Sequence, residues 1–318
     1  MELSQIDPKI IVDDCPGLVV GEHLKTGGQK RVWRCAFNSR AYVLKALLLD
    51  EETRRRVKRE IQVMRVCSSV YLPKFGPIPL RELRVETGME ILYFLEEYID
   101  GVPLHSVYKP MPPQDVVHLG LCISDALGAL AAKKYLHRDV KPMNIMQKTA
   151  ADYILIDAGL ALDPDGDAIT VPGKVVGTRA YLSPDQITLP QKDLDIRSDL
   201  FCLGIVLYEC GTGKHPFWND ETPKGEIVHN ILNFECVSPL HFNPSLPGEL
   251  SSVILRLLRK NREERYRGHK NLESDLSKLM RKFRELSSPK RATDRQSSLK
   301  TKQKGKALGR LSKRGFRR

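Results

Sequence analysis

The amino-acid sequence predicts an α+β protein with two lobes and a tail. We expect a small antiparallel β-sheet lobe that contains one helix, a larger helical lobe, and a disordered basic C-terminal tail. Three observations support this prediction. Residues 19–48 alternate short β-type runs with a polar, glycine-containing turn. Apolar residues recur at helical spacing within 119–130 and 200–210. Basic residues are concentrated in 290–318.

These changes of pattern agree with a domain organisation whose boundaries are implied by the family resemblance of the motifs described below. With 318 residues, 41% of them hydrophobic, the chain can bury the core of one two-lobed unit. A sheet lobe is expected at 17–97 and a helical lobe at 98–286. An N-terminal extension at 1–16 and the tail at 287–318 flank them.

Composition predicts a soluble, cytoplasmic protein. The first residues, MELSQIDPK, contain charges and no apolar stretch, so no secretory signal is expected. The longest apolar-rich region, 119–132, is too short to span a bilayer of ~30 Å, so we expect no transmembrane segment. Seven cysteines without a CxxC pair indicate reduced thiols and argue against structural zinc. The histidines outside the motifs described below show no ligand spacing: His105, His118 and His229. The oligomeric state stays open.

A lysine and a glutamate in the sheet lobe are predicted to meet. The strand at 42–45 ends on Lys45, and a charged helix is expected at 50–65. Glu60 falls fifteen residues after Lys45, beside the apolar positions Val57, Ile61 and Met64. This spacing lets Glu60 point inward and pair with Lys45. The alternative is a surface pair between Glu60 and a neighbouring arginine.

Two helices are expected in the second lobe. After a strand at 91–95, one helix carries the buried stripe Leu119, Ile123, Leu127 and Leu130, and ends before a polar loop. The other carries the stripe Leu200, Leu203, Leu207 and Cys210. Asp199 stands at the start of this second helix, where an N-cap aspartate is common.

The polar loop contains the most informative motif in the chain. Residues 137–144 read HRDVKPMN, and Asp157, in the sequence DAG, follows behind the apolar run YILI. Asp139, Asn144 and Asp157 can supply one carboxylate for a substrate hydroxyl and oxygen ligands for magnesium. Together these motifs resemble the catalytic core of the eukaryotic-like (Hanks-type) serine/threonine protein kinase family.

The resemblance implies the two-lobed protein-kinase fold and a transferase activity. It implies ATP-dependent phosphorylation of serine and threonine hydroxyls on protein substrates, with autophosphorylation and with ATP and Mg²⁺ as cofactors. The implied catalytic residues are a base, a lysine that steadies the phosphoryl group, and an amide: Asp139, Lys141 and Asn144. Asn144 and Asp157 would bind the metal. Lys45, held by Glu60, would hold the α- and β-phosphates of ATP.

The implied nucleotide site departs from the family pattern. The run 25–32 stands where the family has its glycine-rich GxGxxGxV hairpin, but only Gly27 and Val32 match. Lysines, Lys25 and Lys30, replace the outer glycines, and we expect them to reach the ATP phosphates as flexible charges. If they do not, they are surface charges.

The residues after the strand at 91–95 resemble the hinge that binds adenine. Glu97 lies in this hinge, and Glu96 aligns with the gatekeeper position, where a hydrophobic residue is common. A carboxylate there needs a hydrogen-bond donor or water. The alternative is a one-residue slip in the alignment.

An activation segment is also implied. The sequence GTRAYLSPD at 177–185 resembles its anchor, and Asp185, one methylene shorter than the usual glutamate, is expected to meet Arg265. Thr178 matches the threonine that bridges to the catalytic aspartate. Thr170 is a candidate phosphosite that would pair with Arg138, or else a solvent-facing residue.

Two further positions carry implied structural roles. In the family, an aspartate matching Asp199 hydrogen-bonds the backbone of the residues matching His137 and Arg138. Ala158 replaces a packed phenylalanine, and Met64 or a nearby leucine is expected to fill the space.

The tail carries almost all of the net charge. Between 290 and 318 there are twelve Lys and Arg residues and one acid, Asp294, a net +11 of the chain's +12. Few large apolar residues accompany them, which predicts disorder. Nucleic acid is the first candidate partner and an anionic membrane surface the second. A third reading is autophosphorylation of the tail hydroxyls, and a fourth is a solvated extension.

Three rival functions remain open at this stage. A pseudokinase scaffold is suggested by the altered glycine loop and Ala158, although the residues expected to bind phosphate and magnesium are retained. A small-molecule kinase would not need the segment 177–185. A regulatory module whose basic tail binds a polyanion is the third rival.

Overall fold

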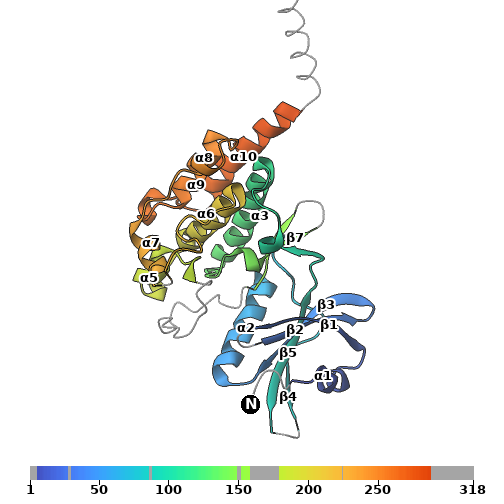
Figure 1. Ribbon diagram of the computed structural model, residues 1–318. Coiled ribbons are helices and arrows are strands. Elements are labelled where there is room, and N and C mark those ends of the chain that lie inside the picture. The colour runs from blue at the N-terminus through green and yellow to red at the C-terminus, as the bar shows by residue number, and fades with distance from the viewer. Residues whose placement is uncertain are drawn as a thin grey trace, which may run out of the picture.

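Five strands form the antiparallel sheet of the smaller lobe in the computed structural model (Figure 1). The structure describes residues 6–27, 30–85, 88–148, 152–157, 179–223 and 225–287. The strands are β1 (Leu18–Gly27), β2 (Lys30–Phe37), β3 (Arg40–Leu48), β4 (Arg81–Arg84) and β5 (Glu90–Glu97). They lie in the order β1-β2-β3-β5-β4.

Both faces of this sheet are covered. Side chains alternate between the faces of a strand, and on β5 Tyr93 belongs to one buried cluster while Phe94 belongs to another. Helix α1 (Pro8–Asp14) contributes Ile11 to the Tyr93 cluster. Helix α2 (Glu51–Val66) contributes Val57 and Ile61 to the Phe94 cluster. Double coverage explains why the centres of β3 and β5 are buried without interruption.

Helix α2 begins where the sequence predicts. The carboxylate of Asp50 accepts a hydrogen bond from the backbone N–H of Thr53 at 2.6 Å, which caps the first turn. The helix carries Glu60 on its buried side.

The larger lobe is helical, as predicted. Its long helices are α3 (Pro113–Ala131), α6 (Ile196–Thr212), α9 (Gly248–Leu257) and α10 (His269–Ser287). Its shorter helices are α5 (Pro184–Thr188), α7 (Ile227–Asn233) and α8 (Pro239–Phe242), with the 3₁₀ turns η2 (Leu104–Ser106), η3 (Pro142–Asn144), η5 (Gln191–Asp193) and η6 (Arg262–Glu264). Both predicted apolar stripes are buried in one core: Leu119, Ile123, Leu127, Leu130, Leu200, Leu203, Leu207 and Cys210. Helix α6 ends at Gly213, whose φ of 71° is left-handed.

A small second sheet carries the polar loop. Strands β6 (Gly101–Pro103), β7 (Ile145–Lys148) and β8 (Tyr153–Leu155) pair in that order. The loop 137–144 runs between α3 and β7, and Asp157 lies two residues beyond β8. The backbone N–H of Ile156 donates to the carbonyl of Asn144 at 2.9 Å. The β7–β8 hairpin therefore brings the two predicted motifs together.

Several predicted features lie outside the described residues: Ala158, Gly159, Thr170, Thr178 and the segment 288–318. Within the described part of the chain, no helix combines the length and apolar character needed to cross a membrane.

Candidate active site

The predicted contact between Lys45 and Glu60 is confirmed. Lys45 Nζ lies 2.8 Å from Glu60 Oε1, and both side chains are buried. Strand β3 delivers the lysine and helix α2 delivers the carboxylate, so the contact joins the sheet to its covering helix.

Lys45 meets two further carboxylates. Its Nζ lies 2.6 Å from Glu96 Oε2 and 3.1 Å from Asp157 Oδ1. Burial alone lowers the pKa of Lys45, but the three carboxylates outweigh it and hold this pKa well above its ordinary value. Lys45 is therefore charged, and it connects α2, β5 and the segment after β8.

Glu96 finds its hydrogen-bond donor in Lys45. In the register of β3 and β5, Lys45 faces Phe94 and Val43 faces Glu96, so Lys45 and Glu96 are diagonal neighbours on one sheet face. Burial raises the pKa of Glu96 even though Lys45 opposes this shift. The carboxylate that the sequence aligns with the gatekeeper position thus points at the predicted ATP-binding lysine.

Asp157 is held by two lysines. Besides Lys45, the ammonium group of Lys30 hydrogen-bonds Asp157 Oδ1. Burial favours the neutral acid, but Lys30 and then Lys45 lower the pKa of Asp157 well below its ordinary value. The backbone of Asp157 has a φ of 69°, a left-handed conformation that is uncommon outside glycine and concentrates at functional sites.

Lys30 enters the site from the hairpin of β1 and β2. Gly27 pairs with Lys30 across the end of the hairpin, and Val32 pairs with Lys45. Lys30 is therefore a diagonal neighbour of Lys45 on the neighbouring strand, and its side chain reaches Asp157. The side chain of Lys25 lies outside the described residues.

The polar loop organises Asp139 with its two neighbours. Lys141 Nζ lies 2.9 and 2.7 Å from the two carboxylate oxygens of Asp139. Asn144 Nδ2 donates to the backbone carbonyl of Asp139 at 2.9 Å and to its Oδ2 at 2.7 Å. Because Asn144 uses its amide nitrogen here, its carbonyl oxygen is the group that can bind a cation.

Asp199 supports this loop from α6. Its two carboxylate oxygens accept the backbone N–H groups of His137 at 2.8 Å and Arg138 at 2.7 Å, as the sequence predicts. His137 Nε2 in turn lies 3.1 Å from the carbonyl oxygen of Ile156. These bonds stabilise the left-handed backbone of Arg138, whose φ is 63°. Burial raises the pKa of Asp199, against the opposing effects of His137 and Arg138.

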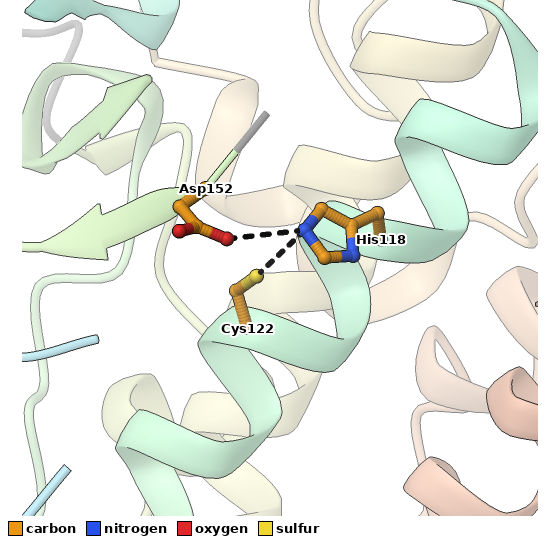
Figure 2. A group of neighbouring side chains, drawn as sticks. All are labelled: His118, Cys122 and Asp152. Carbon is orange, nitrogen blue, oxygen red and sulfur yellow. Dashed lines mark hydrogen bonds and ion pairs between the residues drawn. The ribbon is translucent and has the colours of Figure 1, made fainter. Parts of the chain in front are cut away.

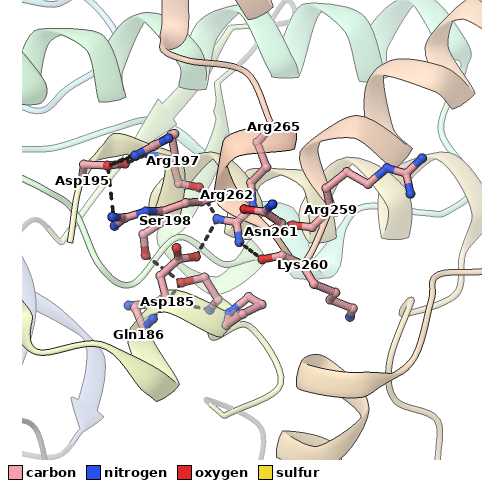
Figure 3. Close-up of polar contacts among 12 residues, drawn as sticks. Asp185, Gln186, Asp195, Arg197, Ser198, Arg259, Lys260, Asn261, Arg262 and Arg265 are labelled. Atoms are coloured by element: carbon pink, nitrogen blue, oxygen red, sulfur yellow. Dashed lines mark hydrogen bonds and ion pairs between the residues drawn. The ribbon is translucent and has the colours of Figure 1, made fainter. Parts of the chain in front are cut away.

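The predicted pair of Asp185 and Arg265 is confirmed. Figure 3 shows Arg265, which follows η6, meeting Asp185 in α5, and 2.6 Å separates Arg265 Nη1 from Asp185 Oδ2. The guanidinium also donates to the backbone carbonyls of Arg197, Arg259 and Lys260. These four acceptors explain how a fully buried arginine is tolerated. The shorter aspartate side chain reaches its partner.

Two glutamines contact Arg138 in the described structure. Its Nη1 donates to Gln191 Oε1 at 3.0 Å, and Gln186 Nε2 donates to its carbonyl at 2.8 Å. The predicted partner, a phosphate on Thr170, cannot be placed because that residue lies outside the described part of the chain. Sequence reasoning missed both glutamines, since amide side chains near such an arginine carry no motif.

The hinge residue Glu97 is anchored to a neighbouring loop. Its backbone N–H donates to the carbonyl of Lys74 at 2.9 Å, and its carboxylate accepts the N–H of Lys74 at 3.1 Å. The side chain and the backbone N–H of Glu97 are thereby engaged, and its backbone carbonyl is the expected contact for adenine.

A small cavity of about 10 Å³ lies beside the three carboxylates that contact Lys45. It is lined by Glu60, Val63, Met64, Leu72, Pro73, Glu96 and Asp157. It holds no more than a water molecule. Met64 does border this space, but whether it fills the volume beside Ala158 stays a prediction.

Comparison with known proteins agrees with this geometry. A family model described as the protein kinase domain matches residues 18–293. A probable serine/threonine-protein kinase of Clostridium perfringens is 31% identical over 248 residues, covering 77% of this chain and 35% of that protein. The serine/threonine-protein kinase PrkC of Bacillus subtilis is 30% identical over 232 residues, covering 71% of this chain and 34% of the relative. The serine/threonine-protein kinase PknB of Mycobacterium leprae is 32% identical over 191 residues, covering 59% and 30%. The chain thus spans about a third of the length of these relatives.

Proposed function

Because the chain belongs to the protein kinase domain family, we propose that it transfers the γ-phosphoryl group of ATP to serine and threonine hydroxyls of proteins. The observation that carries this proposal is the convergence of Lys45, Asp157 and the Asp139 loop on one site. The names of the curated relatives support the choice of hydroxyl acceptor.

The residues of this site fit ATP and Mg²⁺. Asp157 is ionised and Asn144 offers a carbonyl oxygen, and such oxygen ligands suit magnesium. Bound Mg²⁺ would neutralise the charge that develops on the phosphate oxygens during transfer. We assign Asn144 and Asp157 to the metal, and Lys45, oriented by Glu60, to the α- and β-phosphates. Gly27 and Val32 would cover the nucleotide, and the backbone carbonyl of Glu97 would meet the adenine.

Asp139 would act as the base in this proposal. Its carboxylate would accept the proton of the substrate hydroxyl, and Asn144 and Lys141 keep that carboxylate oriented. The ammonium group of Lys141 lies beside the Asp139 carboxylate, and it could also contact and stabilise the phosphoryl group during transfer.

Lys30 would change partner during binding. The ion pair between Lys30 and Asp157 occupies the carboxylate that the metal needs. The ammonium group would therefore leave Asp157 when magnesium binds, and the ATP phosphates would offer it a new anionic partner.

The proposed activity is tested with radiolabelled ATP, magnesium and a generic protein substrate. Asp139→Asn should lower turnover at least about a hundredfold because the base is lost. Lys45→Met and Asp157→Ala should abolish measurable phosphorylation while circular dichroism shows a folded chain. The exposed Asp220→Asn serves as a control with wild-type turnover. Half of the wild-type activity in Lys45→Met or Asp157→Ala would overturn the assignment.

We also propose that the two lobes comprise residues 17–97 and 98–286, and that the protein is cytoplasmic. Strand β5 ends at Glu97, which supports a lobe boundary after that residue. The seven cysteines are all unpaired, which supports a reducing, cytoplasmic setting.

A further inference from the structure

Three side chains with different metal-binding chemistry meet at the turn end of the β7–β8 hairpin, outside the proposed active site. They are His118, Cys122 and Asp152 (Figure 2). His118 Nε2 lies 3.4 Å from Asp152 Oδ1 and 3.5 Å from Cys122 Sγ. The three ligand atoms all lie within 4.8 Å of one another.

The fold holds these side chains in place from two elements. His118 and Cys122 stand four residues apart on α3, so they share one face of that helix. Asp152 immediately precedes β8, and its carbonyl accepts the N–H of Lys148 at 2.8 Å, which closes the hairpin. The carbonyl of Tyr71 accepts the backbone N–H of Leu155 at 2.9 Å, which ties β8 to the segment after α2.

One ring nitrogen of His118 is the shared neighbour of the thiol and the carboxylate. Figure 2 shows both contacts converging on the same ring nitrogen of His118. That nitrogen carries either one proton or one lone pair, so it cannot satisfy the thiol and the carboxylate together. A nucleophilic cysteine relay would use the two opposite ring nitrogens of the histidine. One cation placed between the three groups would satisfy all of them.

Two of the three separations agree with a tetrahedral ion, and the third, between Cys122 Sγ and the Asp152 carboxylate, is below 4.8 Å. Zinc binds thiolate sulfur at about 2.3 Å and imidazole nitrogen at about 2.0–2.1 Å. Tetrahedral angles then put sulfur about 3.5 Å and a carboxylate oxygen about 3.4 Å from that nitrogen. The observed separations are 3.5 and 3.4 Å.

We propose that His118, Cys122 and Asp152 bind a divalent cation of the zinc class, with water as the fourth ligand. The Asp152 side chain is 59% exposed and that of His118 is 31% exposed, so the site opens to solvent. On binding, the Cys122 thiol loses its proton to solvent and His118 carries its proton on Nδ1. The proposal differs from the sequence expectation, which argued against structural zinc, because the third ligand comes from a distant segment.

Such an ion would tie α3 to the start of β8. Asp157, the proposed magnesium ligand of the active site, lies five residues after Asp152. The cation would therefore stabilise the hairpin that positions Asp157. The inference does not depend on kinase activity, since it concerns binding alone.

Cobalt is the probe for this site, because a thiolate bound to Co²⁺ adds a charge-transfer band to the absorption spectrum. Reduced, metal-stripped, untagged full-length chain is titrated with Co²⁺. We expect one equivalent to bind with the thiolate band, and Zn²⁺ to displace it. Cys122→Ser should lose the band, and Cys236→Ser, which changes a thiol far from the cluster in sequence, should keep it.

Asp152→Asn is the second variant. Asp152 is exposed, so this change should leave the fold intact even if Cys122→Ser unfolds the chain. We expect its dissociation constant for Co²⁺ to rise at least about tenfold. The proposal is overturned if the folded wild type binds no Co²⁺, if the band survives in Cys122→Ser, or if Asp152→Asn binds as tightly as wild type.

Discussion

Glu96 and Lys45 form a buried ion pair, with 2.6 Å between Glu96 Oε2 and Lys45 Nζ. Lys45 therefore serves three carboxylates, although the sequence motif provides only for Glu60 and leaves Asp157 to the metal. If Lys45 binds the ATP phosphates as proposed, it would have to give up some of its contacts with these three carboxylates. In that case, this ion pair would couple the position aligned with the gatekeeper to ATP binding.

Glu96→Gln should lower the apparent Michaelis constant for ATP severalfold. The substitution removes a buried negative charge that competes with the phosphates for Lys45 and repels them. Steady-state kinetics at varied ATP concentration measures the effect. Glu97→Gln is the matched control, since the neighbouring carboxylate contacts Lys74 instead. An unchanged or higher Michaelis constant in Glu96→Gln would contradict this role.

Replacing both Lys25 and Lys30 by alanine should raise the apparent Michaelis constant for ATP severalfold, while glycines at both positions are tolerated. Lys30→Ala alone should also lower the magnesium concentration needed for half-maximal activity, because Asp157 loses a competing cation. Titrations of ATP and of magnesium separate the two effects. If neither the Michaelis constant for ATP nor the half-maximal magnesium concentration changes, the lysines are only surface charges.

Asp185→Ala should destabilise the chain by about 3–5 kcal/mol, because it leaves the buried Arg265 without its counter-charge. Denaturant unfolding measures the free energy. The exposed pair of Glu249 and Lys282 provides the control, and Glu249→Gln should leave the unfolding midpoint unchanged. Equal effects of the two substitutions would refute the structural role of the buried pair.

The chain should lose stability in mild acid through His215. Burial lowers the pKa of His215 from 6.5 to about 4. Because the unfolded chain takes up this proton first, the contribution is complete above pH 6.5 and is lost as the pH falls through 4. The loss amounts to about 3 kcal/mol. Denaturant unfolding from pH 7 to 4 measures this loss. The free energy of unfolding should fall less in His215→Asn than in wild type. In the exposed His241→Asn it should fall as much as in wild type. Identical pH profiles for wild type and His215→Asn would rule this out.

The basic segment 290–318 should bind polyanions through charge. Its net charge of +11 with few aromatic residues favours phosphate contacts over base readout. Full-length chain and a chain ending at Ser288 are titrated with duplex DNA, RNA and anionic vesicles at low and moderate salt. We expect binding that is lost on truncation and falls steeply with salt. Equal, weak binding by both chains would make the segment an inert extension.

The sequence by itself determined the two-lobed fold and most of the candidate site. Helical stripes such as Leu119 to Leu130 depend on local periodicity, and α3 follows them. The contacts of Lys45 with Glu60 and of Asp185 with Arg265 could also be predicted, because the family resemblance supplies partners that are far apart in the chain.

Only the tertiary structure decided the other contacts. Glu96 and Lys30 reach the site because strand register makes each a diagonal neighbour of Lys45, and a shift of one residue would turn them to the opposite face. Asp152 meets His118 because the β7–β8 hairpin packs beside α3. Register and packing are settled by the whole core at once, so no local pattern in the sequence encodes these pairs.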